Sequence, residues 1–189
     1  MILYLHGFRS SPLSFKARLL AQHFAKLGRS DEFVCPQLPA SPALAIELAQ
    51  GLIDQAHDQR VTLIGSSLGG FYATYLAEQN QCKALLINPA VQPPRELQSY
   101  VGVTTAFHSD EPFEFKASYV DELKALSIAS ITQPQRYMLI AATGDEVLDW
   151  REMVKHYSGA KQLVIEGSDH GVSEFADYLD MVMAFCDAE

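Results

Sequence analysis

The sequence predicts an α/β protein in which a mainly parallel six-stranded sheet lies between two layers of helices. Six apolar runs of strand length recur along the 189 residues, and amphipathic stretches with helical spacing separate them. Parallel strands need long crossover connections, which helices provide, and these helices cover both faces of the sheet. We therefore expect a three-layer αβα sandwich formed by a single domain that spans residues 1–189.

The six expected strands are near-continuous runs of apolar residues. They lie at residues 2–5, 33–35, 61–64, 84–87, 137–142 and 162–165. Ser11 followed by Pro12 is typical of a helix N-cap and the first helical position, and Gly28 of the end of that helix. Ser41 followed by Pro42 gives the same start signal for the second helix.

Apolar stripes predict which faces of two helices are buried. In the second helix Leu44, Leu48 and Leu52 recur every four residues, so we expect these leucines in the core. The expected buried stripe of the last helix consists of five residues, Phe175, Tyr178, Leu179, Val182 and Phe185.

The turn after the third strand carries the strongest functional signal. Residues 65–70 read Gly-Ser-Ser-Leu-Gly-Gly, directly after an apolar strand and before a helical pattern. In this context G-x-S-x-G forms a nucleophile elbow, and the glycines two residues to either side select Ser67 rather than Ser66. The N–H of Leu68 then lies at a helix start, where it can stabilise an oxyanion.

An acid and a histidine follow in the chain order that this type of triad requires. Asp145 comes just after the strand at residues 137–142, and His170 lies in a glycine-bounded loop after the strand at residues 162–165. Because the carboxyl ends of parallel strands meet at one edge of a sheet, we expect both side chains to lie near Ser67.

The acid has neighbours that could replace it. Glu146 is adjacent to Asp145, and Asp149 lies one helical turn further on. Asp145 is preferred because it directly follows Gly144 at the end of the strand. The alternative predicts that Asp149→Asn cripples turnover while Asp145→Asn leaves it near normal.

The chain resembles the α/β-hydrolase superfamily and, within it, the small bacterial YqiA-type esterase family. The first strand runs directly into His6, Gly7 and Phe8, which are similar to the H-G oxyanion loop of that superfamily. The closer resemblance covers essentially the whole chain and is carried by residues 4–8, 10–12, 65–70, 88–90 and 143–149.

The resemblance implies a minimal α/β-hydrolase fold with sheet order 2-1-3-4-5-6. It implies that the N–H of Phe8 joins that of Leu68 in an oxyanion hole, and that His6 is a structural member of the loop. The implied reaction is acyl transfer through Ser67 from carboxylic esters, or thioesters such as acyl-CoA, without a cofactor or metal. A peptidase, an amidase, a carbon–carbon bond hydrolase or lyase and a non-catalytic binding protein are the alternatives.

Residues 89–134 are expected to form a short lid-like insert between the fourth and fifth strands. Its aromatic residues either line an acyl pocket or pack a helical insert onto the body, and the two interpretations are equally supported. An insert of this length predicts an open pocket for acyl groups of short to medium length. The aromatic residues are Tyr100, Phe107, Phe113, Phe115 and Tyr119.

Arg9 is the candidate for a contact with a carboxylate or phosphate of the substrate, because it directly follows Phe8. The alternative is that Arg9 caps a helix or bridges to an acidic side chain.

Composition narrows the classes of partner. With 14 basic and 23 acidic residues, the net charge of −9 repels a nucleic-acid backbone. No apolar run approaches the ~20 residues of a membrane span, and the three cysteines have neither disulfide nor metal spacing. We expect a cytoplasmic protein whose partner is a small-molecule ester or thioester, and the sequence leaves its oligomeric state open.

Overall fold

The computed structural model describes residues 1–56, 60–105 and 112–188, and in this part of the chain six strands form one parallel sheet. The sheet order is β2-β1-β3-β4-β7-β8. Its strands are β1 (Ile2–Leu5), β2 (Phe33–Val34), β3 (Thr62–Ser66), β4 (Lys83–Ile87), β7 (Tyr137–Ala142) and β8 (Lys161–Ile165). The six expected strands and their order are confirmed, and no strand end differs from its expected position by more than two residues.

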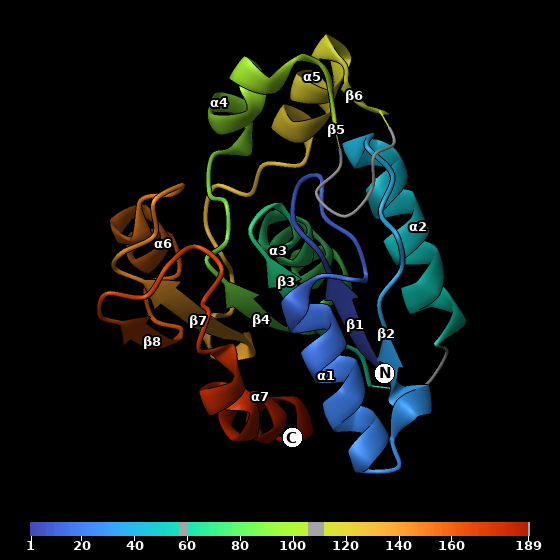
Figure 1. Cartoon of the computed structure of the whole chain (residues 1–189), viewed down its shortest axis with the longest axis vertical. Helices are drawn as coiled ribbons and strands as arrows, with labels where there is room; N and C mark the ends of the chain where they lie inside the picture. Colours follow the sequence, from blue (N-terminus) through green and yellow to red (C-terminus); the bar gives the residue numbers. More distant parts are fainter. Residues whose placement is uncertain (57–59, 106–111, 189) are drawn as a thin grey trace.

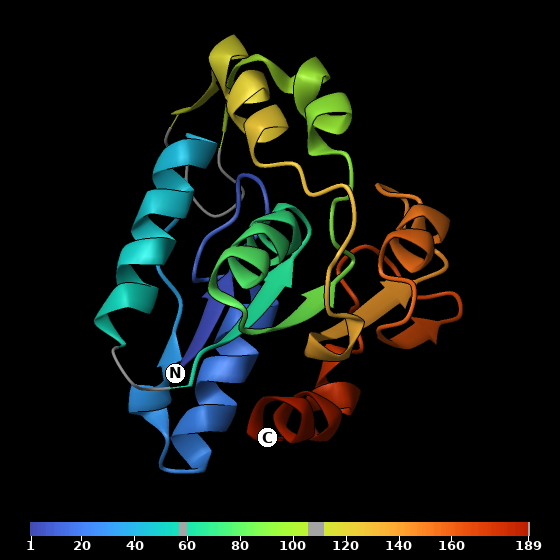
Figure 2. The same cartoon turned by 180° about the vertical axis from the view of Figure 1, so that it is seen from behind.

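Helices cover both faces of this sheet (Figures 1 and 2). On one face α1 (Phe15–Lys26) and α7 (Leu179–Asp187) share a hydrophobic core with the side chains of Ile2 and Tyr4. Leu3 and Leu5 belong to the core of the opposite face, because successive strand side chains point to opposite sides. That face is covered by α2 (Pro42–Gln55), α3 (Leu68–Asn80) and α6 (Trp150–His156). The predicted three-layer arrangement is therefore confirmed.

The predicted helix boundaries are confirmed at two of three sites. Ser41 caps α2 by accepting a hydrogen bond from the N–H of Leu44, with Pro42 at the first position. Gly28 follows the end of α1 with a φ of 69°, a conformation that favours glycine. The prediction at Ser11 is wrong, because α1 begins only at Phe15. The Ser11 hydroxyl instead accepts from the N–H of Leu13 in a local turn.

The predicted leucine stripe of α2 is wrong at Leu44 and Leu48, whereas Leu52 is partly buried against the core. Leu44 and Leu48 are 54% and 39% exposed, whereas Ala45, Ala49 and Ile53 are buried. Small side chains let a helix approach its neighbours closely, so the alanine face packs inward although the leucines are more apolar.

The last helix agrees better with its predicted stripe. Phe175, Val182 and Phe185 are buried, while Tyr178 and Leu179 are partly buried against the same core. The first four residues of this segment form a 3₁₀-helix, η4 (Phe175–Tyr178), which runs into α7.

The segment between β4 and β7 forms a separate layer beyond the helices that flank the sheet (Figures 1 and 2). It contains α4 (Pro93–Leu97), the antiparallel strands β5 (Gly102–Thr105) and β6 (Pro112–Phe115), and α5 (Ala117–Ala125). The strand pair was not predicted. Three short 3₁₀-helices complete the described elements: η1 (Ser30–Glu32), η2 (Gln98–Tyr100) and η3 (Pro134–Arg136).

Candidate active site

Ser67 occupies a sharp turn between the end of β3 and the start of α3. Its φ of 55° and ψ of −122° are unusual for a residue with a side chain. The turn is made possible by Gly65 and Gly69, because a Cβ on Gly65 would collide with the carbonyl of Gly69 and a Cβ on Gly69 with that of Leu5. The G-x-S-x-G spacing thus reflects a tight strand-to-helix connection with a serine at its apex.

The structure brings together the three residues that the sequence singled out. Nε2 of His170 lies 3.1 Å from Oγ of Ser67, and Nδ1 of His170 lies 2.8 Å from Oδ2 of Asp145. The three side chains come from the loops after β3, β7 and β8. With a carboxylate at Nδ1, the neutral imidazole carries its proton there and leaves Nε2 free to accept from the serine hydroxyl.

The carboxylate of Asp145 is fully buried and held by the backbone. Its Oδ1 accepts hydrogen bonds from the N–H groups of Val147 and Leu148, each at 2.8 Å. The alternative acids have other partners. Asp149 caps α6 by accepting from the N–H of Arg151. Glu146 accepts from the backbone N–H of His170.

Asn88 holds the loop that carries His170. The sequence did not predict Asn88 as a functional residue. This fully buried residue follows β4 with a φ of 41°. Its amide nitrogen donates to the carbonyls of Asp169 and His170 at 3.1 and 3.0 Å, and its Oδ1 accepts from the N–H of Ala142. The available signal was a polar residue placed directly after an apolar strand.

The loop after β1 passes directly over Ser67. A Cβ on Gly7 would lie 3.2 Å from the Cβ of Ser67. The buried ring of His6 fixes this loop, because its Nε2 accepts from the N–H of Leu38 and its Nδ1 lies 3.0 Å from the carbonyl oxygen of Gly7. Of the two expected oxyanion donors, Phe8 follows Gly7, which lies against Ser67, and Leu68 directly follows Ser67.

The side chain of Phe8 anchors the segment between β4 and β7. Its ring packs edge-on against Tyr100, Phe113 and Phe115, with ring centroids 5.2–5.5 Å apart. Phe115 in turn contacts Tyr119. These aromatic residues pack the segment onto the body, and Tyr100 also lines a cavity beside Ser67. Phe107 lies outside the described residues.

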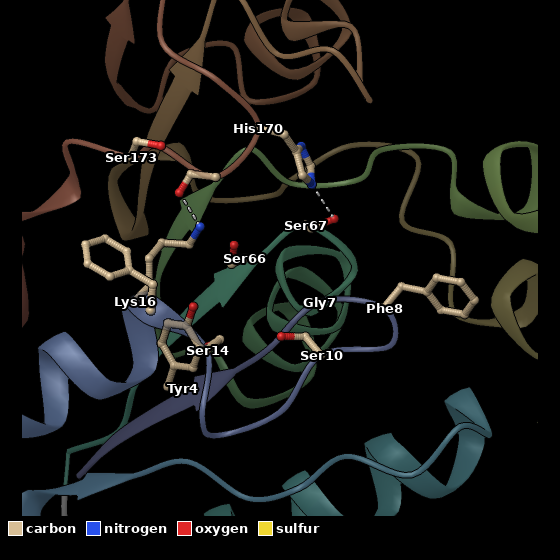
Figure 3. A pocket seen from close by; sticks show the side chains of 12 residues that line it. Tyr4, Gly7, Phe8, Ser10, Ser14, Lys16, Ser66, Ser67, His170 and Ser173 are labelled. Atoms are coloured by element: carbon tan, nitrogen blue, oxygen red, sulfur yellow. Dashed lines mark hydrogen bonds between the residues drawn. The ribbon is translucent and has the colours of Figure 1, made fainter. Parts of the chain in front are cut away.

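Two cavities meet at Ser67 and His170. We call the first the apolar cavity; it has a volume of about 390 Å³, and Leu68, Leu97 and Leu148 are among its lining residues. Burial raises the pKa of Glu96, which also lines it. The second, the polar cavity, has a volume of about 510 Å³ and lies on the side of α1 (Figure 3).

Arg9 lines the apolar cavity, as expected from its place after Phe8. Its Nε donates to the carbonyl of Thr105 at 2.5 Å, and its Nη2 lies 3.4 Å from the Thr105 hydroxyl. The guanidinium group therefore connects the loop after β1 with the end of β5.

The described ranges hold no group of three or more His, Cys, Asp or Glu side chains arranged to bind a metal ion. Within the same residues no helix combines the length and the apolar character needed to cross a membrane.

A family model described as Uncharacterised protein family (UPF0227) matches residues 1–187. The fold is also similar to solved structures of low sequence identity. Est1E of Butyrivibrio proteoclasticus with bound ferulic acid has a TM-score of 0.75 and 13% identity, over 96% of this chain and 87% of that chain.

Two other solved structures show the same likeness. A monoacylglycerol lipase of Paleococcus ferrophilus has a TM-score of 0.66 and 14% identity, over 97% of this chain and 94% of that one. An alpha/beta superfamily hydrolase of Oenococcus oeni has a TM-score of 0.64 and 13% identity, over 99% and 92%. The expected α/β-hydrolase fold is thereby confirmed.

Proposed function

Because this chain belongs to the UPF0227 family and has the α/β-hydrolase fold, we propose that it is a serine hydrolase acting on carboxylic esters. The observation that carries the proposal is the hydrogen-bonded series from Ser67 through His170 to Asp145. The similar folds of Est1E, which binds ferulic acid in its structure, and of a monoacylglycerol lipase support the same class of substrate.

In the first half of the reaction Oγ of Ser67 bonds to the carbonyl carbon of the ester. Nε2 of His170 accepts the hydroxyl proton, and the electron pair of the carbonyl moves onto its oxygen. Asp145 keeps the imidazole in the required tautomer and stabilises the imidazolium ion. When the tetrahedral intermediate collapses, the alkoxide leaves and takes the proton from His170, which yields the alcohol and an acyl-enzyme.

The second half repeats these steps with water as the nucleophile. His170 accepts a proton from water, the hydroxide oxygen bonds to the acyl carbon, and the proton returns to Oγ of Ser67 as the acid leaves. In both halves the N–H groups of Phe8 and Leu68 stabilise the oxyanion. Loss of one such donor typically lowers turnover by ~100-fold to ~1,000-fold.

The apolar cavity supports acyl groups of short to medium length. Its volume of about 390 Å³ lies near the lower end of the ~300–1,000 Å³ that is common for small-molecule sites. Thioesters such as acyl-CoA belong to the proposed substrates, because the same attack and oxyanion stabilisation serve both bonds. Arg9, at the wall of this cavity, is a candidate for contact with the substrate.

Labelling with a fluorophosphonate probe, read by intact mass, tests the nucleophile. We expect one adduct on the wild type and on Ser66→Ala, and none on Ser67→Ala. Turnover of p-nitrophenyl butyrate should fall roughly a million-fold in Ser67→Ala, as in other triads. No adduct on folded wild-type protein would favour a non-catalytic binding protein.

A series of p-nitrophenyl esters tests the cavity. Butyrate-sized esters should be cleaved at least as fast as octanoate, because the apolar cavity is small. Much faster cleavage of long-chain esters would contradict the assigned acyl site.

A further inference from the structure

The polar cavity lies on the other side of Ser67 and His170 from the acyl site, and more hydroxyl-bearing residues line it than line the apolar cavity. Six hydroxyl-bearing residues contribute to its wall, namely Tyr4, Ser10, Ser14, Ser66, Ser67 and Ser173. An ester that reaches Ser67 with its acyl chain in the apolar cavity needs a second space for its alcohol part. A hydroxyl-lined cavity beside His170 suits an alcohol part that is polar.

Lys16 places a cation in the same cavity. Figure 3 shows its side chain extending from α1 toward the loop that carries His170. Nζ donates a hydrogen bond to the carbonyl of Gly171 at 2.5 Å. Elsewhere in the described chain Lys16 has no hydrogen-bond partner, and no described carboxylate lies within ion-pair distance of its amine.

The two carboxylates whose charges influence the Lys16 amine, those of Asp169 and Asp145, have other hydrogen-bond donors. Burial lowers the pKa of Lys16 to about 8, while the charges of Asp169 and Asp145 act to raise it. The carboxylate of Asp169 accepts hydrogen bonds from the N–H and hydroxyl of Ser173, and that of Asp145 is held by His170 and two backbone amides. A half-buried ammonium group with one carbonyl partner retains donors for a ligand.

The N-terminus of the helix that carries Lys16 also favours a negatively charged ligand in the polar cavity. Ser14, Phe15 and Lys16 form the N-terminus of α1, and all three line the polar cavity. The first turn of α1 holds no acidic residue, and the hydroxyl of Ser14 does not cap it. Free N–H groups and the helix dipole at such an end favour an anion.

We propose that Lys16 binds a carboxylate on the leaving-group side of the ester, so that the substrates include esters whose alcohol part carries a carboxylate. This inference rests on the proposed function, because it deepens the substrate class of the same site. One ammonium group with neighbouring hydroxyls matches a single negative charge. The leaving-group side follows from the assignment of the acyl chain to the apolar cavity, because Ser67 and His170 line both cavities and the polar cavity is then left for the alcohol part.

A pair of esters that differ in one charge tests the proposal. Phenyl butyrate has a neutral leaving group, and 4-carboxyphenyl butyrate has an anionic one. We expect Lys16→Met to lower kcat/KM for the anionic ester by roughly tenfold to a hundredfold more than for the neutral ester, as for loss of a charge-assisted hydrogen bond. Lys16→Arg, which keeps the charge, should retain most of the preference.

Two matched variants separate this role from others. Lys26→Met removes the same charge from the far end of α1, about 15 Å away, and should leave the ratio of the two kcat/KM values unchanged. Arg9→Ala tests the other cation near the site and should also leave that ratio unchanged. An equal fall for both esters in Lys16→Met would show that Lys16 only holds the His170 loop, and would overturn the proposal. The proposal would also be overturned if Arg9→Ala lost the preference for the anionic ester while Lys16→Met kept it.

Two more measurements fix the side of the ester and separate the inference from the proposed function. Mono(4-nitrophenyl) glutarate carries its carboxylate on the acyl part, so a Lys16-dependent preference for it over 4-nitrophenyl butyrate would overturn the leaving-group assignment. Binding of 4-hydroxybenzoate and of phenol, followed by calorimetry, needs no turnover. In Lys16→Met the Kd for 4-hydroxybenzoate should rise at least about tenfold, while the Kd for phenol stays unchanged. Equal binding of 4-hydroxybenzoate by the wild type and Lys16→Met would overturn the proposal even if esters are hydrolysed.

Discussion

The side chains around Ser67 are oriented mainly by backbone groups. Asp145 is held by two main-chain N–H groups, Asn88 by two carbonyls and one N–H, and His6 by the N–H of Leu38. Backbone positions are fixed by the sheet and its loops, so these contacts orient the site before a substrate binds. Such preorganisation is what a charged transition state requires.

The choice between the two candidate acids gives a direct test. We expect Asp145→Asn to lower kcat about 10⁴-fold, because asparagine at Nδ1 favours the wrong imidazole tautomer. Asp149→Asn should keep near-normal turnover, because asparagine also caps a helix. The measurement is kcat for p-nitrophenyl butyrate; a crippled Asp149→Asn with a normal Asp145→Asn would reverse the assignment.

Asn88 is expected to act as a positioning residue. Asn88→Ala removes three hydrogen bonds of a fully buried residue, so we expect the free energy of unfolding to fall by about 2–4 kcal/mol and kcat to fall more than KM changes. Asn80→Ala is the matched control, since its amide bonds Gln50 and Leu76 at the far end of α3. Urea unfolding and steady-state kinetics of both variants decide the point, and unchanged kcat in a folded Asn88→Ala would refute it.

At the scale of elements, α2 shows that apolar spacing alone does not identify a buried face. Leu44, Leu48 and Ala45, Ala49 form adjacent stripes, and the smaller residues pack inward. Which face of α2 is buried depends on how closely the helix can approach its neighbours. A hydrophobicity scale for single residues carries no information about that distance.

The two stripes of α2 predict opposite responses to mutation. Ala49→Leu should overpack the interface and lower the free energy of unfolding by about 1–3 kcal/mol. Leu48→Ala should change it by at most about 0.5 kcal/mol, because the leucine is 39% exposed. Urea denaturation of the two variants measures both, and a larger loss in Leu48→Ala would mean that the leucine stripe is buried.

The β5–β6 pair and its neighbours are attached to the site through Phe8 and Arg9, and Arg9 donates a hydrogen bond to the carbonyl of Thr105. Phe8 contributes its backbone to the loop over Ser67 and its ring to the aromatic contacts with Tyr100, Phe113 and Phe115. The position of this segment and the position of the oxyanion loop are therefore mechanically linked.

For the whole molecule, the response to acid depends on buried carboxylates such as Glu78. Burial acts to raise the pKa of Glu78, but hydrogen bonds from Thr132 and Tyr137, together with the charge of Arg136, outweigh it and lower the pKa. A lowered pKa in the folded state means that the unfolded chain binds more protons in acid. The stabilisation is then complete above the unfolded value of about 4.3 and is lost as the pH falls through the lower folded value.

We therefore expect the free energy of unfolding to fall below about pH 4.3, and Glu78→Gln to show a shallower fall. At pH 7 this variant should already be less stable, by about 3–5 kcal/mol, because it leaves Arg136 buried without its charged partner. Asp121→Asn, which removes a solvent-exposed pair with Lys124, is the control and should stay within about 1 kcal/mol of the wild type. Urea unfolding at a series of pH values measures how the free energy of unfolding depends on pH. The same dependence in Glu78→Gln and in the wild type would contradict the role of Glu78 in acid sensitivity.

Much of the fold and the site could be predicted because the signals are local. Apolar runs locate the six strands, and the glycines around Ser67 mark a turn that only small neighbours permit. Ser67, Asp145 and His170 each follow a strand of the parallel sheet, namely β3, β7 and β8, in the order that the triad requires. The sheet order and the loop after β1 came from resemblance to a family, and the structure agrees with both.

The sequence by itself thus determined the strands, the serine turn and the loops that supply an acid and a histidine. Only the tertiary structure decided which acid faces His170, that Asn88 holds its loop, that Lys16 enters the polar cavity and that α2 buries its alanines. These features depend on contacts across 25–155 residues of chain. Local propensity carries no information about such contacts, because they form only when distant loops meet at the carboxyl edge of the sheet.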